Sequence, residues 1–278
     1  MISARYFGSR RGTLLGITVT AILCAWALGL DPRRLFNGGT LTLVLDFVGS
    51  AFVPAFDYED PINGAEPFLL VAVKAVVGTI RYAILAMTVA VPCAVLLSFF
   101  ASVAWWPDHD AWRGILRTIY FVARAVMAFA RSIHELIWGL LFITAIGMSS
   151  EAAIIAIAIP YSGILAKIYS EILEEHSKEA QETLRAIGGR SVTAFLLGLV
   201  PAALPDLISY TFYRFECGIR SAAVLGFVGI ETVGHFIKLS SDEFHYREVW
   251  TYLYVLIVAI VLIEWWASTI RKQLLPAA

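Results

Sequence analysis

The sequence predicts an all-α, polytopic membrane protein with about six transmembrane helices. Of its 278 residues, 59% are hydrophobic and only 15% are charged, whereas soluble domains carry about 25% charged residues. The apolar residues also gather in runs close to the roughly 20 residues that cross the hydrocarbon core of a bilayer. The net charge of −1 provides no basic field, so nucleic acid is not an expected partner.

Residues 1–67 are predicted to form an N-terminal transmembrane helix followed by an external segment. The apolar run 13–30 follows a basic start and has no small-x-small cleavage site, which favours an uncleaved helix over a signal peptide. The rest of this part is rich in acidic residues, glycines and prolines. Its apolar middle, 41–56, contains an aspartate, a glycine and Pro54, so we expect an interfacial helix there rather than a crossing.

Residues 68–278 are predicted to supply about five further crossings. A long apolar run opens this part, and Pro92 lies inside it, where we expect a kink. Trp105 and Trp106 follow the run, as is typical of aromatic rings at a membrane interface. The predicted crossings are 68–100, 112–146, 152–172, a span that begins near Ser191 and passes Pro201, and 250–270.

The distribution of lysine and arginine predicts the orientation in the membrane. Six crossings place both termini on one side, and the loops on that side hold most of the loop lysines and arginines, which prefer the cytoplasm. These residues are Arg5, Arg10, Arg11, Arg113, Arg117, Lys178, Arg185, Arg190, Arg271 and Lys272. We therefore expect the N and C termini and the polar segment 177–189 to be cytoplasmic.

The polar segment between the fourth and fifth crossings is predicted to be a short surface helix. Ser177 can cap its first turn, and Glu179 and Glu182 suit the positive end of the helix dipole. Gly188 can end it in a left-handed conformation, after which Ser191 can cap the next span. These features allow two interpretations: an ordinary solvated loop helix, or a rigid element that transmits movement from a soluble partner.

A family resemblance favours the second interpretation. Residues 182–188, with Pro201 following Gly188 by 13 positions (201 − 188), resemble the cytoplasmic coupling loop of ABC-importer permeases. The resemblance implies a type I permease core in which this helix docks on an ATP-binding subunit. The positions to which it assigns this coupling role are Glu179, Glu182, Arg185, Ala186, Gly188 and Pro201.

Two further stretches, 131–142 and 208–229, resemble phosphonate-type permeases more narrowly. This sequence departs from the family pattern at Thr183 and Leu184, where paired alanines are usual, and at Gly198, where an aliphatic residue is usual. The resemblance implies an inner-membrane subunit that translocates phosphonate or a related phosphorus oxyanion, such as phosphite or a phosphate ester. ATP hydrolysis on a separate subunit would drive this transport.

The same resemblance implies the other components of the complex. It predicts two copies of an ATP-binding subunit, a second copy of the permease and an extracytoplasmic substrate-binding protein. ATP and Mg²⁺ would be bound by the ATP-binding subunits, because this chain contains no GxxxxGK[ST] motif. No cofactor is expected in this chain itself.

Charged residues inside the apolar runs allow two hypotheses, because charges in a bilayer normally face protein or water. They could flank the translocation path, where arginine suits phosphoryl oxygens, or they could form ion pairs that lock the bundle. The spacing i, i+4 predicts two pairs, and Arg214 has no local partner. The candidates are Arg131 with Glu135, Arg214, and Glu216 with Arg220. For Arg81 we consider Asp206 or Glu264 as partner, and we assign Lys167 no function.

Enzymatic and other transport classes are less well supported. His134 and Glu135 begin a zinc-protease motif, but position 138 holds Trp138 instead of the second histidine. The remaining histidines are scattered, so we expect neither a metal site nor catalytic residues. An ion-gradient-driven secondary transporter would be expected to contain inverted repeats, which we do not find. A permease for another small anion is also an alternative.

Overall fold

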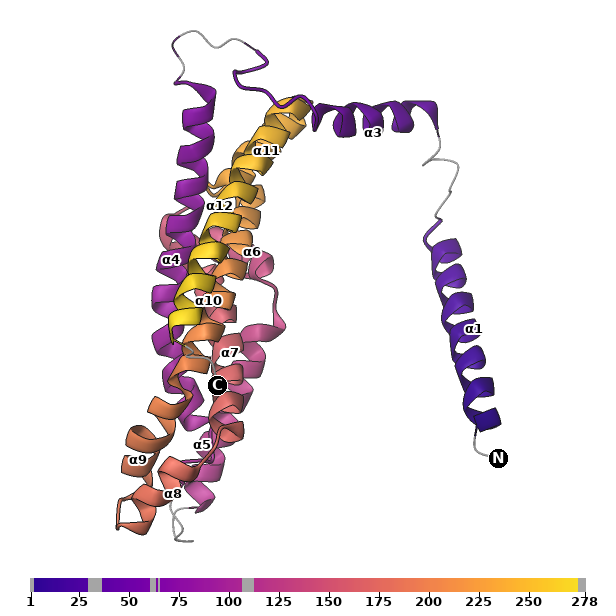
Figure 1. Ribbon diagram of the computed structural model, residues 1–278. Coiled ribbons are helices and arrows are strands. Elements are labelled where there is room, and N and C mark those ends of the chain that lie inside the picture. Colours follow the sequence, from indigo (N-terminus) through magenta and orange to yellow (C-terminus); the bar gives the residue numbers. More distant parts are fainter. Residues whose placement is uncertain (1–2, 30–36, 61–63, 65, 107–112, 275–278) are drawn as a thin grey trace. The chain divides into compact units, whose positions relative to one another are not determined.

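The computed structural model describes residues 3–29, 37–60, 64, 66–106 and 113–274, which form helices and connections without any β-strand (Figure 1). Contacts divide the chain into two units, Met1–Val53 and Pro54–Ala278. The sequence placed this boundary after residue 67. The contacts place it earlier because Ala55 accepts a hydrogen bond from Thr251 at 2.7 Å and donates one to Arg247 at 3.2 Å.

The first unit contains two apolar helices, α1 (Ser3–Ala27) and α3 (Gly38–Ser50). No side chain of α3 is buried. The part of α1 whose side chains the structure describes, Gly12–Ala27, is apolar, and α3 is an apolar helix shorter than a full membrane span. The helices predicted in this part of the chain are therefore present, while a crossing by α1 and an interfacial position for α3 stay predictions.

The second unit contains the long apolar helices that the composition predicts. Four are long and apolar enough to cross a membrane in the described part of the chain. They are α4 (Phe68–Phe100), α7 (Ser150–Glu175), the run Ser191–Val228 and α12 (Tyr246–Leu274). The third of these consists of α9 (Ser191–Ala194), the π-helix η2 (Phe195–Leu199), α10 (Val200–Val224) and the 3₁₀ helix η3 (Leu225–Val228). The bounds of α4 are those predicted.

The predicted third crossing, 112–146, is not one continuous helix. It is broken into α5 (Arg113–Ser132) and α6 (Glu135–Ile146), which meet at 87°. His134 causes a new helix to begin: its backbone is extended, and its Nδ1 accepts a hydrogen bond from the amide of Leu136 at 3.3 Å. With the bent pair counted as one span, the described residues supply up to five candidate spans, and the predicted crossing by α1 would be a sixth.

Small residues allow the helices of the second unit to pack closely. Ala83, Ala86 and Ala90 of α4 are fully buried in the same cluster as alanines of α7. A Cβ atom added to Gly163 of α7 would lie 2.8 Å from the carbonyl oxygen of Met127 in α5. Close backbone approach of this kind is the usual basis of helix association in membranes.

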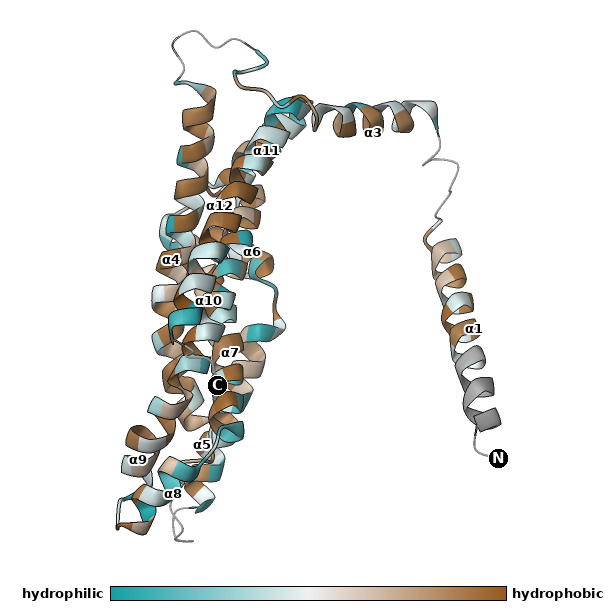
Figure 2. Cartoon of the chain, in the orientation of Figure 1, coloured by the Kyte–Doolittle hydropathy of each residue, from teal (hydrophilic) through white to brown (hydrophobic). Residues whose placement is uncertain are grey.

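The two ends of the second unit differ in composition. Short α8 (Glu179–Ala186) and α9 lie at one end, and α11 (Val233–Asp242) lies at the other with the starts of α4 and α12 (Figure 1). Hydrophobic residues cover much of α4 and α12, whereas hydrophilic residues are concentrated on α8 (Figure 2). At the α11 end, burial and the carboxylates of Glu248 and Glu66 raise the pKa of the Tyr58 hydroxyl.

Candidate functional site

The polar segment predicted at 177–189 forms α8, and Gly188 ends it as expected. The φ angle of Gly188 is 94°, a left-handed conformation that favours glycine. Both predicted serine caps are wrong. Lys178, not Ser177, precedes the first helical residue, and Ser191 is itself the first residue of α9. Neither helix receives a side-chain cap, so contacts with neighbouring segments must hold α8 in position.

Hydrogen bonds join α8 to the connection between α4 and α5. Gln181 is buried, and its Nε2 donates to the carbonyl oxygen of Ala104 at 2.7 Å. Arg185 donates to the same oxygen at 3.3 Å and to that of Trp106 at 3.4 Å. Glu174, at the end of α7, accepts a hydrogen bond from the amide of Val103 at 3.3 Å. A displacement of α8 would therefore also move the α4–α5 connection.

A glycine brings α8 against the following span. A Cβ atom added to Gly198, in η2, would lie 3.0 Å from both the Cα and the backbone nitrogen of Gln181. A larger side chain here would require the backbone of α8 to move, which gives a physical reason for the departure from the family pattern at this position. Nothing in the sequence around Gly198 indicates this contact, because its partner Gln181 lies 17 positions (198 − 181) earlier in the chain.

The other predicted coupling residues face outward. Glu179, Glu182 and Ala186 are exposed on α8, and Pro201 is exposed in the first turn of α10. A cavity of about 390 Å³ lies beside them, between α8 and residues 103–106. We define the coupling end as α8, residues 101–106 and η2. One face of α8 is thus fixed within the chain, and the other is available to a soluble partner.

The predicted pair of Arg131 and Glu135 is wrong, because the bend between α5 and α6 separates the two residues. Glu135 instead accepts a hydrogen bond from the hydroxyl of Ser221 in α10. The hydroxyl groups of Ser221 and Tyr161 are 2.9 Å apart. Glu135 therefore belongs to a hydrogen-bonded group that joins α6, α7 and α10.

The predicted pair of Glu216 and Arg220 is also wrong. Glu216 is buried, and its carboxylate lies 3.6 Å from the guanidinium of Arg271, which α12 supplies. Arg220 is exposed on α10, and no ion pair is recorded for it among the described residues. The ion pair of Glu216 among the described residues thus joins α10 and α12 instead of two residues of α10.

Arg131 and Arg214 line one cavity of about 370 Å³, together with Lys167. We call this the basic cavity. Its three cations come from three helices, α5, α7 and α10, and the rest of its lining is Ala128, Ser132, Ile164 and Ile168. No carboxylate is part of the lining. The structure thus brings together two of the predicted path residues and adds Lys167, for which the sequence predicts no function.

The cations of the basic cavity have different partners. The Nε of Arg214 donates to the hydroxyl of Tyr210 at 2.9 Å, and the guanidinium lies over the rings of Tyr210 and Tyr213. Lys167 forms an ion pair with Glu171, one helical turn away, at 2.7 Å. For Arg131 and Arg214, no ion pair is recorded with any residue that the structure describes. Hydrogen-bond donors of both arginines are thus available for an anion.

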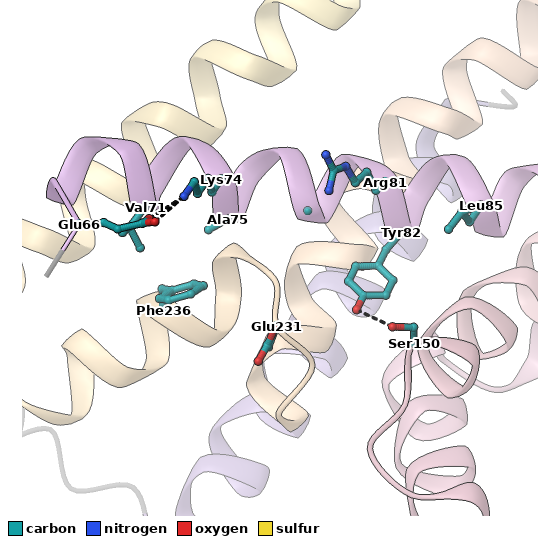
Figure 3. A pocket seen from close by; sticks show the side chains of 11 residues that line it. Glu66, Val71, Lys74, Ala75, Arg81, Tyr82, Leu85, Ser150, Glu231 and Phe236 are labelled. Atoms are coloured by element: carbon teal, nitrogen blue, oxygen red, sulfur yellow. Dashed lines mark hydrogen bonds and ion pairs between the residues drawn. The ribbon is translucent and has the colours of Figure 1, made fainter.

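A second cavity of about 460 Å³ lies between α4, the start of α7 and the region of α11 (Figure 3). Its charges are mixed: Lys74 pairs with Glu66 at 2.6 Å, and Arg81 and Glu231 also line it. Figure 3 shows Tyr82 directed toward Ser150, with their hydroxyl oxygens 3.1 Å apart. We call this the mixed-charge cavity.

Arg81 forms an ion pair with neither of the two predicted partners, Asp206 and Glu264, among the described residues. The carboxylate of Asp206 lies 3.7 Å from His176, at the end of α7. Arg81 is exposed on α4, so it does not form the predicted internal pair.

Comparisons with known proteins place this arrangement in a family. Residues 69–276 match the family described as binding-protein-dependent transport system inner membrane component. The chain belongs to this family. It is therefore a permease subunit of an ABC importer, a membrane protein with several apolar helices. Permeases of this class function with an ATP-binding subunit and a binding protein.

Three relatives are named as permeases for phosphorus compounds. HtxE of Stutzerimonas stutzeri, named for phosphite transport, is 33% identical over 57% of this chain and 61% of its own length. The phosphite permease PtxC of the same species is 25% identical over 91% of this chain and 85% of its own length. The phosphate-import permease PhnE of Mycolicibacterium smegmatis is 28% identical over 91% of this chain, which spans 44% of PhnE.

Solved structures confirm the fold. The chain resembles the MetNI methionine ABC transporter in an inward-facing conformation with a TM-score of 0.66 and 19% identity. The match covers 76% of this chain and 99% of that one. An amino acid ABC transporter matches with a TM-score of 0.62 and 16% identity, over 73% of this chain and 94% of the other. At these identities the likeness is one of architecture alone, that of a type I importer permease.

Proposed function

We propose that this permease translocates phosphonate or a related phosphorus oxyanion, such as phosphite or a phosphate ester, into the cell. The observation that carries the proposal is the basic cavity, where Arg131, Lys167 and Arg214 converge without a carboxylate in the lining. The names of the relatives, which refer to phosphite and phosphate, agree with this chemistry.

Arginine explains why the ligand would be a phosphorus oxyanion. Its planar guanidinium can donate two parallel hydrogen bonds to phosphoryl oxygens, and it remains charged at any physiological pH. Arg214 uses its Nε for Tyr210, which leaves the two terminal nitrogens of its guanidinium for a ligand. An apolar cavity without these donors would not compensate an oxyanion for its lost hydration.

The translocation path in this proposal follows α10 past the basic cavity. Arg131 and Arg214 contact the anion, and exposed Arg220 extends the positive charge along the same helix. Glu135 and Glu216 border the path, where their bonds to Ser221 and Arg271 hold neighbouring helices in position.

Coupling would occur through the exposed face of α8. Glu179, Glu182 and Ala186 would contact an ATP-binding subunit, with Arg185 holding the α4–α5 connection and Gly188 and Pro201 shaping the ends of the junction. In the proposed complex, two permease chains bind two ATP-binding subunits, which hold ATP and Mg²⁺, and an extracytoplasmic binding protein delivers the anion. ATP binding opens the path outward, and hydrolysis resets it.

The proposed orientation places α8 and both termini in the cytoplasm of a cell with an inner membrane. Hydrophilic α8 and basic residues such as Arg113, Lys178 and Arg185 gather at the same end of the second unit, in agreement with the positive-inside rule. Residues 1–2 and 275–278, the termini themselves, lie outside the described residues.

Reconstitution tests the proposed function. The permease, its ATP-binding subunit and its binding protein are placed in liposomes, and uptake of radiolabelled phosphite, phosphate and a methylphosphonate is measured. We expect ATP-dependent uptake of at least one of these solutes and none of sulfate. Uptake of sulfate instead would establish a permease for another anion. Uptake driven by an ion gradient without ATP would establish a secondary transporter.

A further inference from the structure

The ion pair between Lys167 and Glu171 lies at the edge of the basic cavity. Nζ of Lys167 is 2.7 Å from one carboxylate oxygen of Glu171 and 2.9 Å from the other. Both side chains are about one-third exposed, at 31% and 35%. Lys167 lines the cavity, whereas Glu171 is one turn further along α7 and is not part of the lining.

The pair resolves an electrostatic conflict inside the cavity. Three cations in one space of about 370 Å³ repel one another, and Glu171 offsets only the charge of Lys167. A partly exposed pair of this kind is held weakly, because both groups keep part of their hydration. An anion in the cavity can therefore compete with Glu171 for the lysine.

We propose that Lys167 leaves Glu171 when the oxyanion arrives and donates to a phosphoryl oxygen, which completes a three-cation site. Arg131 and Arg214 match the two charges of a phosphorus dianion, and Lys167 contributes a third donor group that can be withdrawn. As the anion departs, Glu171 takes back the lysine and so favours release. This inference rests on the proposed function for the identity of the anion.

Binding measurements on two variants test this exchange. The complex of permease and ATP-binding subunit is placed in nanodiscs, and binding of radiolabelled phosphite and inorganic phosphate is measured at equilibrium. We expect Lys167→Gln to weaken binding about tenfold or more, since a charge-assisted hydrogen bond is lost. We expect Glu171→Gln to tighten binding several-fold, because the lysine no longer has a competing partner, and to slow uptake.

A second ion pair of the same spacing provides the control. Lys238 and Asp242, on α11, lie 2.6 Å apart at positions i and i+4, and neither lines the basic cavity. Lys238→Gln and Asp242→Asn should leave anion binding unchanged. If Lys167→Gln and Glu171→Gln instead change binding in the same direction, or neither changes it, the pair has only a structural role and the exchange is overturned.

Two further measurements distinguish a free oxyanion from a lipid headgroup, and a failure of the proposed function from a failure of the role of Lys167. A phospholipid headgroup shares the phosphoryl chemistry, so the lipid retained by the complex is identified by mass spectrometry. Retention of lipid that Lys167→Gln abolishes, with no binding of free phosphite or phosphate, would overturn the exchange. Absence of oxyanion uptake by the unmodified complex overturns the proposed function, whereas normal uptake with unshifted variants overturns only the role of Lys167.

Discussion

The coupling end and the basic cavity use their polar side chains in opposite ways. At the coupling end, buried Gln181 and neighbouring Arg185 donate to carbonyl oxygens of the α4–α5 connection. In the basic cavity, Arg131 and Arg214 line the same space with no carboxylate in the lining. The first region holds parts of the chain in fixed positions. The second places two arginines beside a space that no carboxylate lines.

The largest expected effect comes from forcing α8 away from η2 at the coupling end. Gly198→Leu places a side chain where Gln181 already lies within 3.0 Å of the first carbon atom. Overpacking of this kind costs about 1–3 kcal/mol, and only movement of α8 away from η2 can relieve it. We expect ATP-driven uptake by the reconstituted complex to fall more than tenfold.

Gly114→Leu is the matched control, because a Cβ atom at Gly114 in α5 meets nothing within 4 Å. This variant should retain uptake and the bound ATP-binding subunit. Normal uptake by Gly198→Leu would contradict the idea that close contact between α8 and η2 transmits the movement.

Removing a cation from the basic cavity should have the next largest effect. It should lower recognition of the anion and leave coupling to the ATP-binding subunit intact. Arg214→Gln is expected to lower oxyanion uptake about tenfold, because a charge-assisted hydrogen bond contributes about 1.5–3 kcal/mol and tenfold corresponds to about 1.4 kcal/mol. Assembly with the ATP-binding subunit and basal ATP hydrolysis should persist, since Arg214 lies outside the coupling end. Uptake and ATP hydrolysis measured on the same preparation distinguish a loss of anion recognition from a loss of coupling.

Arg117→Gln provides the comparison for this variant. Arg117 also lies over an aromatic ring, that of Phe121 at 5.8 Å, but does not line the basic cavity. The Arg117→Gln variant should leave oxyanion uptake unchanged. Equal losses in both variants would mean that cation–π contacts, rather than the cavity, explain the result.

The sequence predicts best what depends on composition and length. The bounds of α4 and the presence of α7 follow from long apolar runs, and neither depends on how the helices pack. The bend between α5 and α6 was missed because hydrophobicity continues through it. Its cause is local, however, and His134, whose side chain can cap a helix, offered a signal that the continuous apolar pattern outweighed.

The basic cavity could not be predicted in the same way. Arg131, Lys167 and Arg214 lie on three helices, and i, i+4 spacing detects only neighbours on one helix. The same limit explains the wrong pair for Glu216, whose partner Arg271 comes from α12. For Glu216, a contact between helices decided the partner, whereas Lys167 and Arg214 have partners one turn away on their own helices.

A smaller effect is expected from weakening a contact at the coupling end without adding bulk. Gln181→Met removes the hydrogen bond to Ala104 but keeps the size of the side chain. Arg185 still donates to the same carbonyl oxygen, so only about 0.5–1.5 kcal/mol is lost. We expect uptake to fall a few-fold and thermal stability to decrease slightly, as measured by uptake assays and thermal unfolding. Unchanged uptake would show that Arg185 alone suffices to hold the connection.

The smallest effect is expected in the mixed-charge cavity, where Lys74 is paired and Glu231 offsets nearby positive charge. Arg81→Gln removes a cation from a space that already contains two carboxylates, so an oxyanion gains little there from Arg81. We expect uptake to change less than about twofold, a difference of about 0.4 kcal/mol. If the loss instead equals that of Arg214→Gln, the translocation path also includes the mixed-charge cavity, and a lining free of carboxylates is not what identifies an anion site in this permease.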